Sequence, residues 1–298
     1  MAEKAQQETA AVGTVDAPQE ANLLDQILTE GRMARDEFQK EAAKDMIAEF
    51  VNQVMSGELT MSNNMDVAIN ARIAEIDRLI SDQMNEIMHH EEFQKLEGSW
   101  RGLHYLLKNS LTGTQLKIRV MSVTKKELLK DFERALEFDQ SSLFKKIYED
   151  EYGTFGGAPF GALIGDYEFG NHPQDMALLD KLSQVAAAAH APFLSAASPE
   201  MFGWDSFSEM SEVRDVSKIF DRTEYMKWRS FRESEDSRYV GLTLPHVLMR
   251  EPYGAATKPT ETFRFEEDVD GKDHKKYLWG NAAYALGTRL TEAFSMHG

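Results

Sequence analysis

Cysteine is absent from the 298 residues of the sequence. Its absence excludes disulfide bonds, thiolate metal sites and a cysteine nucleophile, and it is typical of proteins from a reducing cytoplasm. Long apolar runs are absent as well. None approaches the roughly 20 residues of a bilayer-spanning helix, and residues 1–20 hold no signal-peptide core. We therefore expect a cytoplasmic protein without direct membrane insertion.

Basic residues are scarce relative to acidic ones. Fifty Asp and Glu stand against 33 Lys and Arg, which gives a formal net charge of -17. Such a chain repels a phosphate backbone unless a basic patch intervenes, and the lysines at 125–126, 145–146 and 275–276 form only short pairs among acids. We expect no nucleic acid partner. The 42% hydrophobic content predicts a mainly globular body.

No catalytic, phosphate-binding or metal-binding motif is complete. The glycines of residues 153–165 lack the G-x-x-x-x-G-K-[ST] pattern and precede a predicted strand instead of opening a helix. Residues 89–92 read His-His-Glu-Glu, but adjacent helical positions point about 100° apart and cannot converge on one ion. The serines lack a G-x-S-x-G nucleophile elbow. The sequence therefore predicts no catalytic residues, no cofactor and no metal.

Two carboxylates leave one enzymatic alternative open. Asp166 and Glu168 alternate along a predicted strand and so share one face. A soluble α/β carboxylate-dependent hydrolase could use such a pair, and it would need a concave pocket around both acids with shifted pKa values. Structural hydrogen bonding or a salt bridge at the strand end is the favoured interpretation, because no sequence signal supplies a substrate cleft.

The N-terminal residues divide into a tail and a short helix. Residues 1–20 are small and polar, which predicts a disordered tail. Residues 21–31 predict a helix with one narrow apolar stripe, formed by Leu23, Leu24, Ile27 and Leu28. An isolated helix this short is marginal in water, so the stripe predicts a recognition element that folds in the groove of a partner.

The next part of the chain has the 3.6-residue period of helices. Residues 35–110 therefore predict a helical N-terminal region, with helices over 35–55, 64–88 and 93–108.

Residues 111–298 predict an α/β body. Strands are expected at 116–123, 161–169, 192–197 and 238–244, with helices after Thr124 and over 173–190, and an acidic loop or hairpin at 261–271. The predicted fold class is thus α/β (α+β), a helical N-terminal region followed by a mixed β-sheet core flanked by helices.

Arginines and aromatics alternate in residues 228–238. Trp228, Arg229, Phe231, Arg232 and Arg238 could form an anion site or a fold-internal network. Because several acids lie close in sequence, internal ion pairs are the favoured prediction.

Seven segments in a fixed order carry a family resemblance. They are LEGSWRGL (96–103), PFGALIGDYEF (159–169), HAPF (190–193), WRSFR (228–232), GLTLP (241–245), PYG (252–254) and YLWGN (277–281). The chain resembles the large subunit of the type VI secretion contractile sheath, the TssC or VipB family, from about Leu23 to Asn281. His246 and Glu251 depart from the family pattern, which often has Arg and an apolar residue there.

The resemblance implies a bacterial structural subunit and not an enzyme. The family's large subunit pairs with a small sheath subunit (TssB/VipA-like), and the heterodimers stack around the Hcp inner tube on a baseplate. A ClpV-type AAA+ ATPase disassembles the contracted sheath by recognising the family's N-terminal helix. The stripe of residues 23–28 matches that helix, although it could instead pack on the small subunit or on the helices after residue 35. Family members continue beyond YLWGN, so residues 111–298 are expected to form a sheath body without the C-terminal sheath-linking region.

Overall fold

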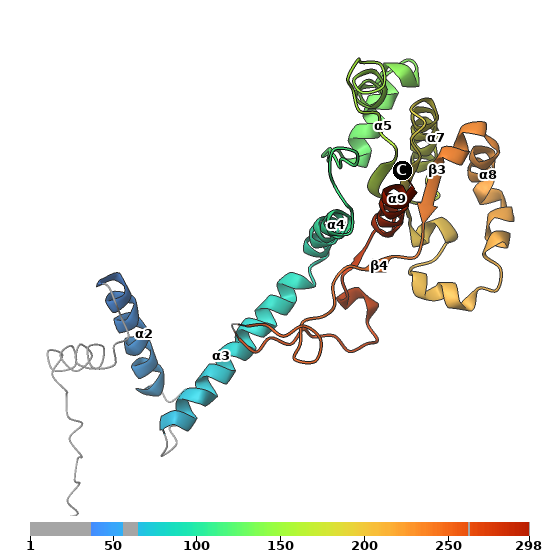
Figure 1. The fold of residues 1–298 in the computed structure, drawn as a ribbon. Coiled ribbons are helices and arrows are strands. Elements are labelled where there is room, and N and C mark those ends of the chain that lie inside the picture. The colour runs from blue at the N-terminus through green and yellow to red at the C-terminus, as the bar shows by residue number, and fades with distance from the viewer. Residues whose placement is uncertain (1–36, 56–64, 262, 298) are drawn as a thin grey trace, which may run out of the picture. The chain divides into compact units, whose positions relative to one another are not determined.

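The computed structural model describes residues 37–55, 65–261 and 263–297. The chain divides into two compact units, residues 1–76 and 77–298. Figure 1 draws the described elements as coloured ribbons. The predicted tail, the predicted helix 21–31 and its apolar stripe lie outside the described residues.

Long helices form the first described part of the chain. Helix α2 covers Glu37–Met55, and α3 covers Met65–Met88, running from the first unit into the second. Helix α4 covers Glu91–Lys108 and begins after His90, whose backbone is extended. Glu91 and Glu92 in its first turn and Lys108 in its last turn complement the helix dipole. The predicted helices are confirmed to within two residues at each boundary.

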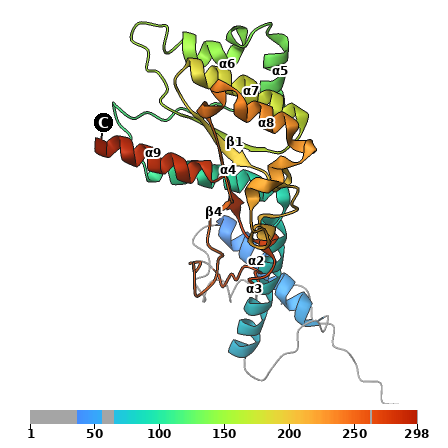
Figure 2. The same ribbon diagram turned by 90° about the vertical axis from the view of Figure 1, so that its right-hand side faces the viewer.

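Three parallel strands form the sheet of the second unit. They are β1 (Leu163–Phe169), β2 (Phe193–Ala197) and β3 (Val240–Thr243), in the order β1-β2-β3. Helix α7 (Pro173–Ala188) connects β1 to β2, and α9 (Ala283–His297) follows the last strand. Figure 2 shows β1 between α7 on one side and α9 with α4 on the other. These strands and α7 confirm the predicted mixed α/β fold class.

The core lies mainly around α7. Its Leu, Met and Val residues are almost completely buried, and the alanines and phenylalanines of β1 and β2 are equally inaccessible. Strands covered on both faces carry near-continuous apolar runs, and all five residues of β2 are buried. The fully inaccessible core side chains include Phe169, Leu179, Val185 and Ala186.

One predicted strand is wrong. Residues 116–123 have the alternating pattern of a strand, but they form an extended segment outside both sheets. A strand requires a hydrogen-bonded neighbour, and within the described chain residues 117–123 make no backbone-to-backbone hydrogen bond. The helix after it is confirmed. In α5 (Lys125–Arg134) the side chains of Thr124 and Glu127 form the predicted capping box.

Short helical turns make up much of the remaining chain. Between α5 and β1 lie η1 (Phe138–Gln140), α6 (Ser142–Phe144) and the π-helix η2 (Lys145–Glu149). Between β2 and β3 lie η3 (Pro199–Phe202), η4 (Phe207–Glu212), η5 (Val216–Asp221), η6 (Thr223–Tyr225), α8 (Met226–Glu233) and η7 (Glu235–Tyr239).

A second, two-stranded sheet precedes α9. It pairs β4 (Val247–Leu248) antiparallel with β5 (Trp279–Gly280), and η8 (His274–Lys276) comes just before β5. The described residues of the predicted acidic segment 261–271 form a loop without strands. Across the described residues, every helix is too short or too polar to cross a lipid bilayer.

Candidate functional site

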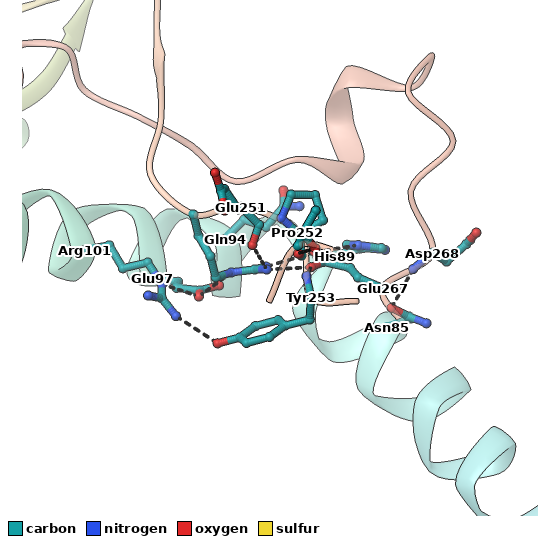
Figure 3. A network of polar contacts seen from close by, with 12 residues as sticks. Asn85, His89, Gln94, Glu97, Arg101, Glu251, Pro252, Tyr253, Glu267 and Asp268 are labelled. Atoms are coloured by element: carbon teal, nitrogen blue, oxygen red, sulfur yellow. Dashed lines mark hydrogen bonds and ion pairs between the residues drawn. The ribbon is translucent and has the colours of Figure 1, made fainter. Parts of the chain in front are cut away.

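A buried ion pair connects two segments of the second unit (Figure 3). Arg250 lies two residues after the end of β4, and only 6% of it is exposed. Its Nη1 donates to Oε2 of Glu267 at 2.5 Å, and its Nη2 donates to Oε1 of Glu267 at 2.9 Å. A bidentate guanidinium–carboxylate contact fixes both the distance and the orientation of its partners. The loop that contains Glu267 is therefore held against the chain after β4.

Helix α4 joins this pair through a second acid. Oε1 of Glu97 accepts from Nε of Arg250 at 3.1 Å and from Nε of Arg101 at 2.6 Å. Arg101 also donates from Nη2 to the hydroxyl of Tyr253 at 3.4 Å. LEGSWRGL and PYG, which the sequence singled out as separate segments, thus lie in one polar network.

Tyr253 closes the network through its backbone and its ring. Its amide donates to Oε2 of Glu267 at 2.9 Å, while the Glu267 amide donates to the Tyr253 carbonyl at 2.9 Å. The guanidinium carbon of Arg250 lies 4.7 Å from the centre of the Tyr253 ring. The buried charges thus have hydrogen-bonded or ring partners, as burial of charge requires.

The end of α3 contacts the same loop. Nε2 of His89 lies 3.4 Å from Oε1 of Glu267, and Oδ1 of Asn85 accepts from the Asp268 amide at 3.1 Å. We define the polar network as Asn85, His89, Glu97, Arg101, Arg250, Tyr253 and Glu267. It joins the end of α3, the helix α4 and the loop of residues 250–268.

The electrostatics of the network favour the ionised pair. Burial opposes ionisation of Glu267, but hydrogen bonds from Arg250 and from the Tyr253 amide outweigh it and hold the pKa of Glu267 below its ordinary value. Of the side chains in the network, none lines the groove described below. The arrangement can hold the helices and the loop in one geometry.

Asn281 forms a second junction, between YLWGN and GDYEF. Its Oδ1 accepts from the Ala283 amide at 2.8 Å and so caps α9. Its Nδ2 donates to the carbonyls of Gly165 and Tyr167 at 3.2 and 3.1 Å. The hydroxyl of Ser195 donates to the same two carbonyls at 2.8 and 2.7 Å. One side chain therefore ties the start of α9 to β1.

The carbonyls of Gly165 and Tyr167 need hydrogen-bond donors because the pairing of β1 with β2 is irregular. Ile164 pairs with Leu194 and Glu168 pairs with Ala196, so four steps along β1 face two steps along β2. Such a bulge disrupts the hydrogen-bond ladder and leaves backbone groups without strand partners. Asn281 and Ser195 supply the missing donors. Ser195 is therefore a buried hydrogen-bond donor with a structural role, and not a nucleophile in an elbow motif.

Close packing explains one of the family glycines. Gly102 of α4 lies against the ring of Tyr284 in α9, and a Cβ at this position would overlap the ring. Only glycine allows this approach of the two helices.

The two candidate acids, Asp166 and Glu168, serve different contacts. Oε1 of Glu168 lies 2.8 Å from Nε2 of His246, and that contact lowers the pKa of Glu168. Asp166 lies beside Tyr284, whose pKa is raised by burial and by the neighbouring Asp166 carboxylate. Asp166 lines the groove described next and Glu168 does not. A hydrolase of the predicted kind needs one pocket around both acids, and the groove contains only one of them.

A groove of about 920 Å³ lies beside β1. It is lined by residues of α4, the segment 114–123, residues 158–162, residues 164–167 of β1 and α9. Several wall residues are apolar and well exposed, including Trp100, Val120, Leu290 and Phe294.

The aromatic and arginine-rich segment packs as part of the fold. Trp228 lies between the rings of Phe220 and Phe231, at 6.0 and 5.7 Å between centroids. Arg229 donates to a backbone carbonyl, that of Asp221, at 3.0 Å. Arg238 forms the predicted ion pair within the chain, with Glu235 at 3.3 Å, and this pair lies on the surface with side-chain exposures of 64% and 82%.

Residues 89–92 diverge, but they do not share one helix as predicted, because His89 and His90 lie between α3 and α4. His89 faces Glu267, whereas Glu91 pairs with Lys95 at 2.8 Å. Among the described residues, no group of three or more His, Cys, Asp or Glu is arranged to hold a metal ion.

Sequence reasoning missed the polar network. Glu267 falls in the predicted acidic loop. Its partners Glu97 and Arg250 lie 170 and 17 residues before it in the sequence. The available signal was the presence of a charged residue inside otherwise apolar family segments, at Glu97 in LEGSWRGL and at Arg250 before PYG. The predicted stripe of Leu23, Leu24, Ile27 and Leu28 lies outside the described residues.

Comparison with known proteins assigns the chain to a family. Residues 70–298 match the family VipB, described as EvpB/VC_A0108, tail sheath N-terminal domain. The chain is 45% identical over 293 residues to the type VI secretion system sheath protein TssC1 of Pseudomonas aeruginosa, a match that covers 98% of this chain and 59% of TssC1. It thus spans less than two thirds of that relative. The family match and this identity show that the chain belongs to the VipB/TssC family of type VI secretion sheath proteins.

Proposed function

We propose that this chain is a structural subunit of a bacterial type VI secretion contractile sheath, working in the cytoplasm and without a catalytic role. The observation that carries the proposal is the 45% identity to TssC1 across 98% of the chain. The polar network and the Asn281 junction support it, because the charged and polar side chains of the family segments are engaged in holding elements together.

The partner that we propose first is a small sheath subunit of the TssB/VipA type. An exposed apolar stripe on α3 supports this pairing. Ile80, Met84 and Ile87, which we call the α3 stripe, lie on one helix face and are 43%, 37% and 45% exposed. Exposed apolar stripes of this kind mark protein interaction sites. A partner helix with apolar residues at a similar spacing could cover them.

The heterodimers would stack around an Hcp inner tube on a baseplate, and contraction would propel the tube with its effectors. In such a machine the energy resides in the difference between extended and contracted subunit packing. A rigid body is needed to transmit that change, and the buried ion pairs of the polar network supply rigidity between α3, α4 and the loop 250–268.

Co-purification tests the pairing. This chain and a small sheath subunit, expressed together with a tag on one of them, should elute as a stable heterodimer. The double variant Ile80→Glu, Ile87→Glu should lose the partner, because charges cannot be buried in an apolar contact without partners. Leu136→Glu is the matched control, since Leu136 is 89% exposed and lies outside the α3 stripe. Absence of a heterodimer with the unaltered chain contradicts the proposal.

Disassembly of the contracted sheath is proposed to depend on recognition of the helix predicted at residues 21–31. A ClpV-type ATPase would recognise the stripe of Leu23, Leu24, Ile27 and Leu28 after contraction, by accepting its apolar face in a groove. Titration of a peptide of residues 21–35 into the ATPase N-terminal domain should give saturable binding, and Leu24→Asp should abolish it. Binding that is equal for both peptides would show that the stripe is not the recognised feature.

A further inference from the structure

His246 contacts an acid on a strand that is not its neighbour in the sheet. It lies between β3 and β4, directly before Val247, the first residue of β4. Its Nε2 lies 2.8 Å from Oε1 of Glu168 on β1. Because β2 separates β1 from β3 in the sheet, the contact joins the chain that follows β3 to the opposite edge strand.

The contact depends on charge more than on hydrogen-bond direction. Nε2 of His246 is buried, and it has no aligned hydrogen-bond acceptor among the described residues, although Oε1 of Glu168 lies so close. A neutral imidazole has one N–H donor and no net charge, so it gains little from an oxygen that lies off the N–H direction. An imidazolium gains the attraction of an opposite charge at this distance, and partial burial strengthens that attraction.

The described charged groups around the contact also come from α4, α5 and α7. Nζ of Lys125 donates to the backbone carbonyl of Glu168 at 2.7 Å and pairs with Oδ1 of Asp175 at 2.8 Å. The contact with His246 and the charges of Lys95 and Lys125 hold the pKa of Glu168 below its ordinary value. Lysines and carboxylates keep their charge between about pH 5 and pH 8, whereas histidine is the residue type that changes charge in this range.

An aromatic contact holds the imidazole in place. The ring of Phe207 in η4 meets the imidazole edge-on, with 4.9 Å between the centroids and 85° between the planes. The nearby acid of η4, Glu209, is engaged elsewhere, because it accepts from the amides of Asp205 and Ser206 at 2.8 and 3.3 Å. The ring contact does not depend on charge, so a change of protonation alters the strength of the contact with Glu168 and leaves the imidazole beside it.

We propose that the contact between His246 and Glu168 is a proton-dependent link between the three-stranded sheet and the chain that enters β4. The link is strong where the imidazole is protonated and the carboxylate is ionised, and it weakens as the pH rises and His246 loses its proton. The same chain reaches Arg250 and the polar network two residues after β4. The link therefore controls how firmly that network is attached to the sheet. It rests on contacts within the described chain and not on the proposed sheath role.

A double-mutant cycle at two pH values tests the link. The unaltered chain, His246→Gln, Glu168→Gln and the double variant are unfolded in urea at about pH 6 and about pH 8. Glu168→Gln keeps the backbone carbonyl that binds Lys125. The cycle isolates the coupling of the two side chains from all other titrating groups. At about pH 6 the coupling should change the unfolding equilibrium constant about threefold or more, and at about pH 8 by less than about twofold.

Two further variants separate the charge of the link from its shape. His246→Arg carries a charge at both pH values, so its coupling to Glu168 should be the same at both. His104→Gln is the matched control, since His104 is exposed on α4, and it should change the unfolding equilibrium constant equally little at both pH values.

A measurement on the unaltered chain needs no substitution. Exchange of the imidazole C2 hydrogen, followed by mass spectrometry, reports the charge of one histidine in an identified peptide. His246 should change its charge between about pH 6 and about pH 8. Coupling that is absent at about pH 6, coupling that is equal at both pH values, or an imidazole that keeps one charge throughout this range would each overturn the inference.

Discussion

At the scale of single residues, Arg250 is the centre of the polar network. It contacts Glu267 and Glu97 and is buried, and it therefore holds two acids from different elements. Removing one member of a buried pair leaves an uncompensated charge, which costs more than the pair itself contributes.

Arg250→Ala should lower the free energy of unfolding by about 3–5 kcal/mol, because it leaves Glu267 buried without its guanidinium partner. Urea unfolding followed by circular dichroism measures the change. Arg289→Ala is the matched control, since the Arg289–Glu292 pair has side-chain exposures of 73% and 48%, and it should cost about 0–1 kcal/mol. Equal losses for both variants would contradict the structural importance of the buried pair.

The pH dependence of stability should show the same pair. The pKa of Glu267 is lower in the folded chain than its ordinary value of 4.5. Its contribution is therefore fully present above pH 4.5 and is lost as the pH falls through the folded-state pKa. Urea unfolding of the unaltered chain and of Glu267→Gln should differ most near neutral pH, and the difference should shrink in acid. A difference that stays constant into acid would show that the Glu267 charge does not stabilise the fold.

At the scale of elements, the family segments work in pairs. LEGSWRGL in α4 meets PYG through Arg101 and meets the preceding Arg250 through Glu97, and YLWGN meets GDYEF through Asn281. The segments thus form junctions between helices, strands and loops. Each junction brings together residues that lie more than 100 positions apart in the chain.

Asn281→Asp separates the two functions of Asn281. The aspartate keeps an oxygen that can cap α9, but it cannot donate to the carbonyls of Gly165 and Tyr167, and it places a charge near both. We expect a loss of about 1–3 kcal/mol, the cost of leaving buried polar groups unsatisfied, measured by urea unfolding. The intact cap predicts unchanged helicity in the native state. An unaltered unfolding midpoint would mean that Ser195 alone satisfies the bulge.

At the scale of the whole molecule, charge and apolar surface act against each other. The formal net charge of -17 keeps molecules apart, while the α3 stripe and the groove expose apolar side chains. The balance between charge repulsion and apolar attraction should therefore depend on pH.

The chain should associate most strongly near its sequence pI of 4.9, where the net charge and hence the repulsion vanish. Light scattering during a slow titration from neutral pH measures this. The double variant Ile80→Glu, Ile87→Glu should scatter less at its own pI, because it removes exposed apolar surface. Equal scattering by both proteins would exclude the α3 stripe as a cause of association.

Much of the fold could be predicted from local patterns. The period of α3 and α4, the Thr124–Glu127 capping box and the apolar runs of β1 and β2 all depend on residues near one another in sequence. Segment 116–123 was predicted wrongly because its alternating pattern describes a strand but says nothing of whether a neighbour exists. Asp166 and Glu168 are both exposed on β1, as the alternation predicts, but only Asp166 lines the groove.

Composition and segment order were enough to assign the class of the protein: an acidic, cysteine-free α/β chain whose ordered segments mark a sheath family. The sequence also predicted the local elements, because helix caps and periodicity act over a few residues. The folded arrangement was needed to show that Arg250 meets Glu97 and Glu267, that Asn281 completes a bulged strand, and that β1 borders an open groove. The physical reason is that burial and hydrogen-bond satisfaction depend on residues far apart in the chain, and local patterns carry no record of which of them meet.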